Sequence, residues 1–307
     1  MSGIKVFAPA SVGNCIVGFD TLGLALQHPG DEIIAKKTDR KGLRITKITG
    51  AKGKLPYEIE KNTAGWAAQR LLQHLNATDM GIDMEIHKKM PIGSGLGSSA
   101  ASAVAGAFAI NVLLKQPLQK RQLLPFILDG EALASGSRHA DNVAPSLIGG
   151  IVLSRGENDI HRIMAPKGLI ATVIYPHIQI LTKDARNILS DTVPLKDVVT
   201  QNANLAGFIV ACFTSNIDLL SRCLQDVLIE PQRAKLIPHF HEVKEAALAQ
   251  GALGCSISGA GPSIFALSAN TFIAENAANA MQKVFADHQI KSQRFISEIN
   301  PEGAIRY

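Results

Sequence analysis

Aromatic residues and clustered basic residues are both scarce in this sequence. Only 5% of its 307 residues are aromatic, and the formal net charge is only +5. A nucleic-acid-binding surface would need a basic patch and, for single strands, aromatic rings on which bases stack. The basic residues instead lie in scattered pairs, such as Lys36–Lys37 and Lys120–Arg121. We therefore expect no nucleic-acid partner, although the mild basic excess favours anionic ligands.

Closely spaced cysteine pairs and long apolar runs are also lacking. None of the four cysteines forms a CxxC pair, and they stand at positions 15, 212, 223 and 255. Reduced, buried thiols are expected rather than zinc ligands or disulfides. The longest apolar stretch, 100–114, is too short to cross a bilayer, and the first residues show no signal-peptide pattern. These features predict a cytoplasmic protein with no membrane partner.

Strand-like and helix-like segments follow one another without strict alternation, which favours an α+β fold. Strands are expected at 4–8, 32–36, 43–48, 82–87, 151–154, 169–174, 255–258, 263–267 and 292–299. Helices are expected at 63–75, 98–114, 118–135, 184–189, 197–211, 217–227, 233–250 and 271–286. We expect two domains, 1–160 and 161–307, although no linker marks the boundary.

The segment PIGSGLGSSAA, residues 91–101, has the composition of a phosphate-binding loop. Its three glycines leave backbone N–H groups bare, its serines add hydroxyl donors, and an apolar helix is expected to begin directly after it. The segment lacks both the Lys-Ser/Thr ending of a P-loop and the GxGxxG spacing of a dinucleotide site. Taken alone, a glycine-rich turn is also compatible with a simple tight turn.

Two other segments strengthen the phosphate-loop interpretation. Residues 8–24, APASVGNCIVGFDTLGL, form a small-residue segment with one amide, Asn14, and one acid, Asp20. Residues 255–265, CSISGAGPSIF, place a second glycine turn between apolar runs. Together the three segments predict a site built from both halves of the chain.

The three segments resemble, in order, the first, second and third motifs of the GHMP kinases. The resemblance extends over nearly the whole chain. It implies a ribosomal-S5-domain-2-like N-terminal domain that binds ATP and a ferredoxin-like C-terminal domain. ATP contacts are then implied at Asn62, Pro91, Ile92, Gly93, Ser94, Gly95, Leu96, Gly97, Ser98, Ser99, Ala100 and Ala101.

The resemblance also implies that Ser99 and Glu131 bind Mg²⁺, an ion that prefers hard oxygen ligands. Without the resemblance, Glu131 would be interpreted as a solvated acid on a helix. Asn62 would likewise be interpreted as a helix cap, rather than as a residue that faces adenine.

Within this family, further segments are similar to those of homoserine kinases. They are SVGNCIVGFDTLGLAL (11–26), SGSRHADNVAPSLIGG (135–150) and LTKDAR (181–186). The similarity implies contacts with L-homoserine from Asn14, Asp20, His139, Asn142, Thr182, Arg186 and Arg233, with Asn142 and Arg186 taking part in catalysis. One departure is Arg138, which stands where the family commonly has an aromatic residue before the His-Ala-Asp run.

The chemistry of homoserine fits these residue types. Its carboxylate suits the planar guanidinium of Arg186, and its ammonium needs an acceptor such as Asp20. Because no Asp–Lys pair is evident, we expect phosphoryl transfer without a dedicated base. A homodimer is also implied. The alternatives are a GHMP kinase for mevalonate or shikimate, and a catalytically silent relative that senses a ligand.

Overall fold

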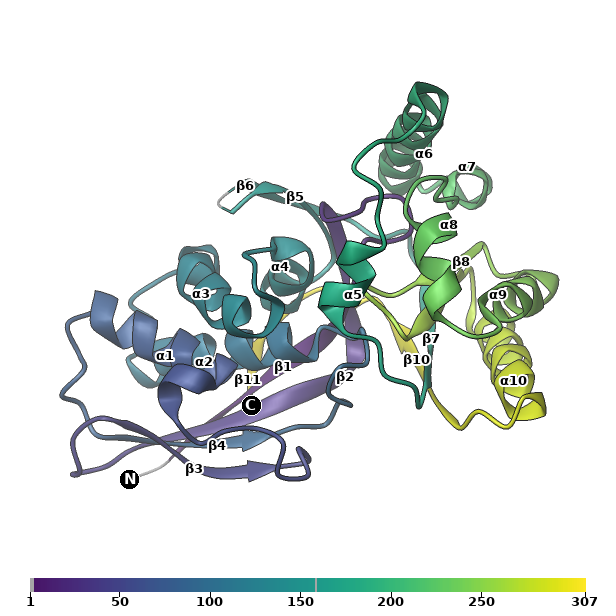
Figure 1. Cartoon of the computed structure of the whole chain (residues 1–307). Helices are drawn as coiled ribbons and strands as arrows, with labels where there is room; N and C mark the ends of the chain where they lie inside the picture. Colours follow the sequence, from purple (N-terminus) through teal and green to yellow (C-terminus); the bar gives the residue numbers. More distant parts are fainter. Residues whose placement is uncertain (1–2, 158) are drawn as a thin grey trace.

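The computed structural model describes residues 3–157 and 159–307, which build two β-sheets with helices packed on them (Figure 1). The first sheet contains β1 (Ile4–Gly13), β2 (Leu22–Lys37), β3 (Leu43–Thr49), β4 (Ile82–His87), β5 (Ile151–Gly156), β6 (Asp159–Ile163) and β11 (Ile305–Arg306). The second contains β7 (Ile170–Pro176), β8 (Gly254–Ile257), β9 (Ile264–Ser268) and β10 (Ser292–Glu298). This mixture of elements confirms the predicted α+β class.

The first sheet has the strand order β11-β1-β2-β4-β3, and β5 joins it by pairing with β2 and β6. Its pairings are antiparallel except that of β3 with β4. One face is covered by α1 (Thr63–His74), α2 (Ser98–Leu113), α3 (Leu124–Ser135) and α4 (Ala140–Ile148) (Figure 1). The end of the chain returns to this sheet as β11, so the first half is completed by the last residues.

Helix α2 lies at the centre of the first half. It is apolar on all sides, and only Ser99 and Leu113 are not fully buried. Its neighbours are α1, α3, α4 and strands β1 and β2. A helix that is hydrophobic all round is expected in the interior of a domain. This packing fixes the N-terminal end of α2, and with it the glycine-rich loop that precedes it.

The second sheet is antiparallel throughout, with the order β10-β7-β9-β8. Along the chain its elements run β7, α9 (Phe240–Ala249), β8, β9, α10 (Thr271–Asp287), β10. This is the βαββαβ arrangement expected of a ferredoxin-like domain. Neighbouring residues of β7 point to opposite faces, so Val173 joins the large core cluster and Ile174 joins the cluster under α9 and α10.

The remaining helices lie between and beside the two sheets. They are α5 (Thr182–Asn187), α6 (Leu195–Thr214), α7 (Ile217–Cys223) and α8 (Glu230–Arg233). Short 3₁₀ turns occur at Ile59–Lys61, Lys120–Leu123 and Ala234–Leu236. In Figure 1, α6 and α7 project away from the two sheets. Among the described residues, no helix combines the length and apolarity that a bilayer crossing requires.

Three expected helices differ from the structure. The helix expected at 233–250 is wrong as a single element, because Pro238 separates α8 and its 3₁₀ turn from α9. The helix expected at 118–135 begins as a 3₁₀ turn, with α3 starting at Leu124 beside Pro125. The helix expected at 217–227 ends at Cys223. Helix α4 and strands β6 and β11 were not predicted.

Candidate active site

A cavity of about 330 Å³ opens between the two halves of the molecule. All three motif segments contribute to its wall. From the first half come Asn14, Asp20, Leu55, Thr63, Lys88, Ile92, Gly93, Ser94, Gly95, Gly97, Ser98, Ser99, Ser102, Glu131, Ala134, Ser135, His139, Asp141 and Asn142. From the second half come Ile180, Thr182, Arg186, Arg233, Gly259, Ala260 and Gly261.

The segment 91–101 contains the glycine-rich loop that follows β4 and the first residues of the buried helix α2. Gly93, Gly95 and Gly97 adopt φ values of 68°, 82° and 63°, which favour glycine. Close packing also excludes a side chain at Gly97, where a Cβ would lie 2.1 Å from Ser11 Oγ. The Ser98 hydroxyl is buried in the cavity wall and has no partner among the described residues. This arrangement presents N–H groups, a free hydroxyl and the positive end of a helix to an anion.

The third motif packs directly against the glycine-rich loop. Ser258 Oγ donates a hydrogen bond to Gly95 O at 2.6 Å, and the Ser263 N–H donates to Ser94 O at 3.2 Å. Asn14 Nδ2 of the first motif donates to Gly259 O at 3.0 Å. These bonds hold together segments that lie more than 150 residues apart in the sequence.

Ser99 and Glu131 lie together at the start of α2 and on α3. Ser99 Oγ donates to Glu131 Oε1 at 2.9 Å, while Glu131 Oε2 is buried without a hydrogen-bond partner among the described residues. Burial raises the pKa of Glu131 to about 7, against the opposing effect of the Ser99 hydrogen bond. A carboxylate oxygen left unpaired beside a hydroxyl oxygen fits the ligand preference of Mg²⁺. These residues therefore fit the metal site that the family resemblance implies.

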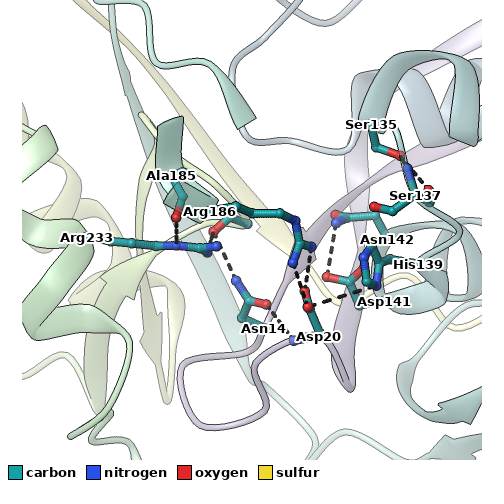
Figure 2. Close-up of polar contacts among 11 residues, drawn as sticks. Asn14, Asp20, Ser135, Ser137, His139, Asp141, Asn142, Ala185, Arg186 and Arg233 are labelled. Carbon is teal, nitrogen blue, oxygen red and sulfur yellow. Dashed lines mark hydrogen bonds and ion pairs between the residues drawn. The ribbon is translucent and has the colours of Figure 1, made fainter. Parts of the chain in front are cut away.

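Asp20 and Arg186, predicted to bind opposite charges of the substrate, bind each other across the cavity. Arg186 Nη1 and Nη2 each donate to one carboxylate oxygen of Asp20, both at 3.0 Å. Figure 2 shows the Asp20 carboxylate between Arg186 and His139, whose Nδ1 lies 3.9 Å from Asp20 Oδ2. Arg186 Nε is buried without a partner among the described residues. Opposite charges thus face one another where a zwitterion could bind between them.

Arg233 supports the same region from α8. Its Nε donates to Ala185 O at 2.8 Å and its Nη1 to Gly259 O at 3.1 Å. Its guanidinium lies 4.8 Å from the ring centre of Phe19 (a cation–π contact), and burial lowers its pKa. Arg233 lines the cavity and also fixes two backbone segments of its wall. Thr182, the first residue of α5, lines the cavity as well.

Asn142 lies at the first turn of α4 with its amide already oriented. Its Oδ1 accepts from Ser11 Oγ at 2.9 Å. Its Nδ2 donates to Asp141 Oδ2 at 3.3 Å, the contact drawn in Figure 2. Asp141 was not predicted as a site residue, although it belongs to the His-Ala-Asp run. Burial and the charge of Asp20 raise the pKa of Asp141 to about 7.

Asn62 and Arg138 lie outside the cavity wall. Asn62 Oδ1 accepts from the backbone N–H groups of Ala64 and Gly65, so its side chain caps α1. The adjacent Thr63 does line the cavity. Arg138 forms ion pairs with Asp129 of α3 and with Glu157 in the turn after β5. It therefore points away from the cavity, whose wall includes its neighbour His139.

A buried charged network beneath the loop was also not predicted. Lys88 Nζ forms an ion pair with Asp31 and donates to Ser98 O at 2.8 Å and to Ser102 Oγ at 2.7 Å. Asp31 also accepts from the Lys89 N–H at 3.0 Å. A fully hydrogen-bonded buried ion pair is costly to break, since removing one partner leaves an unpaired charge. The network ties the first turn of α2 to strand β2.

Comparisons with known proteins bear on both fold and family. Residues 62–150 match the GHMP kinases N terminal domain, and residues 208–287 match GHMP kinases C terminal. A homoserine kinase of Chlorobium phaeovibrioides is 43% identical over 99% of this chain and 99% of its own length. The crystal structure of homoserine kinase from Cytophaga hutchinsonii is 48% identical, has a TM-score of 0.96, and covers 100% of this chain and 98% of its own. A mevalonate kinase from L. major, 18% identical with a TM-score of 0.72 over 96% of both chains, shares the fold.

Proposed function

Because this chain belongs to the homoserine kinases of the GHMP kinase family, we propose that it phosphorylates the hydroxyl of L-homoserine with ATP. The homoserine hydroxyl oxygen bonds to the γ-phosphorus as the bond from that phosphorus to the ADP oxygen breaks, and the hydroxyl proton leaves. The products are O-phospho-L-homoserine and ADP. This would be the step of threonine biosynthesis before threonine synthase, carried out by a cytoplasmic homodimer.

The observation that carries this proposal is that the Asp20–Arg186 pair and the glycine-rich loop line the same cavity. Both lie in the wall of one cavity, so an anion on the loop and a zwitterion at the pair would be neighbours. The homoserine carboxylate would form an ion pair with Arg186, and its ammonium would form one with Asp20. A substrate such as mevalonate or shikimate has no ammonium and would leave Asp20 unpaired.

The residues of the wall divide into two groups in this proposal. The loop and Ser98 hold the phosphates, and Ser99 with Glu131 would hold Mg²⁺, which supplies neutralisation of the phosphate charge. Asn14, His139, Asn142, Thr182 and Arg233 orient the amino acid, and Asn142 and Arg186 also stabilise the transition state. The chain leaves the first sheet after β6, at Ile163, and enters the second sheet at Ile170, where β7 begins. This change of sheet lies close to the expected boundary at residue 160, and it supports a division into an ATP-binding half and a second half.

We propose that the reaction needs no dedicated base, because positioning and charge neutralisation account for most of phosphoryl transfer. Asp141 provides the sharpest test, since its raised pKa and its place in the cavity wall would suit a base. Asp141→Asn should lower kcat by less than about 10-fold, whereas loss of a base costs about 10²–10⁴-fold. A larger fall that removes the acid limb of the kcat–pH profile would contradict the base-free mechanism.

The activity itself is tested by coupled ADP release with homoserine, mevalonate and shikimate as separate acceptors. We expect turnover with homoserine and none above background with the other two. Turnover with mevalonate or shikimate alone would reassign the substrate within the family. Binding of homoserine by calorimetry without turnover on any acceptor would instead identify a ligand sensor.

A further inference from the structure

The outer face of α6 carries a continuous apolar stripe. Its residues are Val199, Ala203, Ala206, Val210 and Phe213, all of them exposed. The exposed fractions of the large side chains are 62% for Val199, 51% for Val210 and 72% for Phe213. Their alternating spacing of four and three residues is the heptad spacing with which one helix packs along another. The opposite face holds α6 on the molecule through buried residues such as Phe208 and Gln201.

Charged residues are missing from the whole length of this helix after its first turn. No Asp, Glu, Lys or Arg occurs from Val198 to Ile217. A helix that stays in water normally has charged residues on its outer face. The exposed faces of α9 and α10 follow that rule, with Glu245 and Lys283 as examples. An exposed apolar stripe without charge is typical of a contact surface.

The order of side chains along the stripe is self-complementary. Val199 and Val210 lie equally far from the midpoint between Asn204 and Leu205, and so do Ala203 and Ala206. A two-fold axis that passes through that midpoint, perpendicular to the helix, therefore places Val199 against Val210 of a second copy. The same rotation places Ala203 against Ala206, where small side chains allow the helices to approach closely. Such self-complementarity is the property that a two-fold contact requires.

The charge at the helix start also favours this arrangement. Lys196 is exposed in the first turn of α6, at the same distance from the midpoint as Phe213 in the last turn. In an antiparallel pair, Lys196 thus lies beside the C-terminal turn of the second copy. A cation is stabilised there by the partial negative charge of the helix end, whereas it is unfavourable at the N-terminus of its own helix.

We infer that α6 is the surface through which two copies of this chain associate as an antiparallel, two-fold pair. A helix of 20 residues is about 30 Å long, so α6 supplies the apolar centre of a contact that needs about 800 Å² from each copy. Polar residues on its flanks, among them Thr200, Asn202 and Thr214, supply the rim. Figure 1 shows α6 projecting from the molecule, where a second copy could reach it. This inference gives the proposed homodimer a specific contact.

Charge substitutions at the paired positions test the contact and its direction together. V199K or V210E alone places a charge against a valine twice, and each should raise the dimer dissociation constant at least about 10-fold. V199K/V210E places opposite charges against each other at both sites and should restore the dimer. V199K/V210K, its matched control, introduces two charges of like sign and should remain monomeric. Sedimentation velocity from low to high micromolar concentration measures all four, with far-UV circular dichroism to verify folding.

A second control separates the stripe from exposed apolar residues in general. Phe213→Glu should dissociate the dimer, whereas Phe272→Glu, at a phenyl group 76% exposed on α10, should leave it intact. A wild-type chain that stays monomeric, or single variants that keep the wild-type mass, would overturn the inference. Failure of V199K/V210E to recover would overturn the antiparallel pairing. Homoserine-dependent turnover by a monomeric variant would show that kinase activity does not depend on this contact, so the two proposals can fail separately.

Discussion

Glu131 illustrates how a buried carboxyl group can weaken the fold that holds it. Burial raises its pKa from the ordinary 4.5 to about 7, so the folded chain retains a proton that the unfolded chain has released. Between pH 4.5 and about pH 7 the contribution of Glu131 to stability therefore decreases as the pH rises, and it is lowest above about pH 7. The difference between the two pKa values corresponds to roughly 3 kcal/mol of unfolding free energy, at about 1.36 kcal/mol for each pKa unit.

Replacing Glu131 by glutamine should therefore stabilise the ligand-free protein in alkaline solution. We expect Glu131→Gln to raise the free energy of unfolding at pH 8 by up to about 3 kcal/mol, and by much less at pH 5, as measured by urea denaturation. The exposed Glu60→Gln serves as a control and should have little effect at either pH. An equal gain at both pH values would show that charge burial is not the cause. The same variant should lose Mg²⁺ affinity in a dye-competition assay.

Asp20 should contribute to homoserine binding rather than to the chemical step. Asp20→Asn removes the charge that pairs with Arg186 and, in the proposed complex, with the ammonium. A lost charge-assisted hydrogen bond of about 1.5–3 kcal/mol corresponds to a KM for homoserine that is higher by about 10- to 150-fold. Steady-state kinetics with homoserine and ATP varied separately should show this rise for homoserine alone, with Asp39→Asn as an exposed control. Abolished kcat with unchanged homoserine affinity would make Asp20 the missing base.

Local sequence patterns identified several residues of the cavity wall, whereas Glu131 and Arg233 were expected from the family resemblance alone. Asn14, Asp20 and the glycines at 93–97 stand in recognisable segments, and the structure places all of them in the cavity wall. The Lys88–Asp31 pair joins residues that are 57 positions apart, and no spacing rule indicates such a partner. The effect of burial on Asp141 was equally hidden, because it depends on which segments fold over that carboxyl group.

Among the structural elements, the glycine-rich loop depends most visibly on close packing. A Cβ at Gly95 would lie 2.6 Å from Ser258 O and 2.9 Å from Gly261 O, while one at Gly93 would meet nothing within 4 Å. Both residues have positive φ values, so alanine is strained at either position by about 1–2 kcal/mol. Gly93→Ala thus reports the strain alone, and Gly95→Ala adds the displacement of the third motif.

We expect Gly95→Ala to lower the free energy of unfolding by clearly more than Gly93→Ala, by about 1–3 kcal/mol further. Urea denaturation without ligand measures this difference and avoids any direct effect on ATP binding. Equal losses for the two variants would show that the third motif moves aside easily. The contact between Ser258 and Gly95 would then contribute little to the shape of the loop.

Elements with a strong period were predictable, and those with conflicting local signals were not. The alternating run Ile82–His87 became β4, and the uniformly apolar run after Gly97 became the buried α2. Helix α4 was not predicted because Pro145 lies inside it and glycines flank its segment, and both residue types are local signals against a helix. Strand β11 is only two residues long, and it forms because it pairs with the edge of β1. Such features are decided by tertiary packing rather than by local preference.

The molecule as a whole closes its cavity with residues from both halves, so ligands should stabilise the halves together. Binding to the folded state alone adds about 2.7 kcal/mol at a ligand concentration 100 times Kd. For a chain of 307 residues, that corresponds to a rise in Tm of roughly 4 °C. Differential scanning fluorimetry should show such a rise with MgATP and a separate one with homoserine.

Asp20→Asn and Glu131→Gln should each reduce one of these two rises in Tm and leave the other unchanged. Asp20→Asn should lose most of the homoserine rise and keep that of MgATP, because the Asp20 carboxylate pairs with Arg186, the other residue proposed to bind the amino acid. Glu131→Gln should lose the Mg²⁺-dependent part of the ATP rise and keep that of homoserine, because its carboxylate lies beside Ser99. If one variant removed both rises, the two groups of residues would form a single interdependent site. The separate roles proposed for the loop and for the Asp20–Arg186 pair would then be wrong.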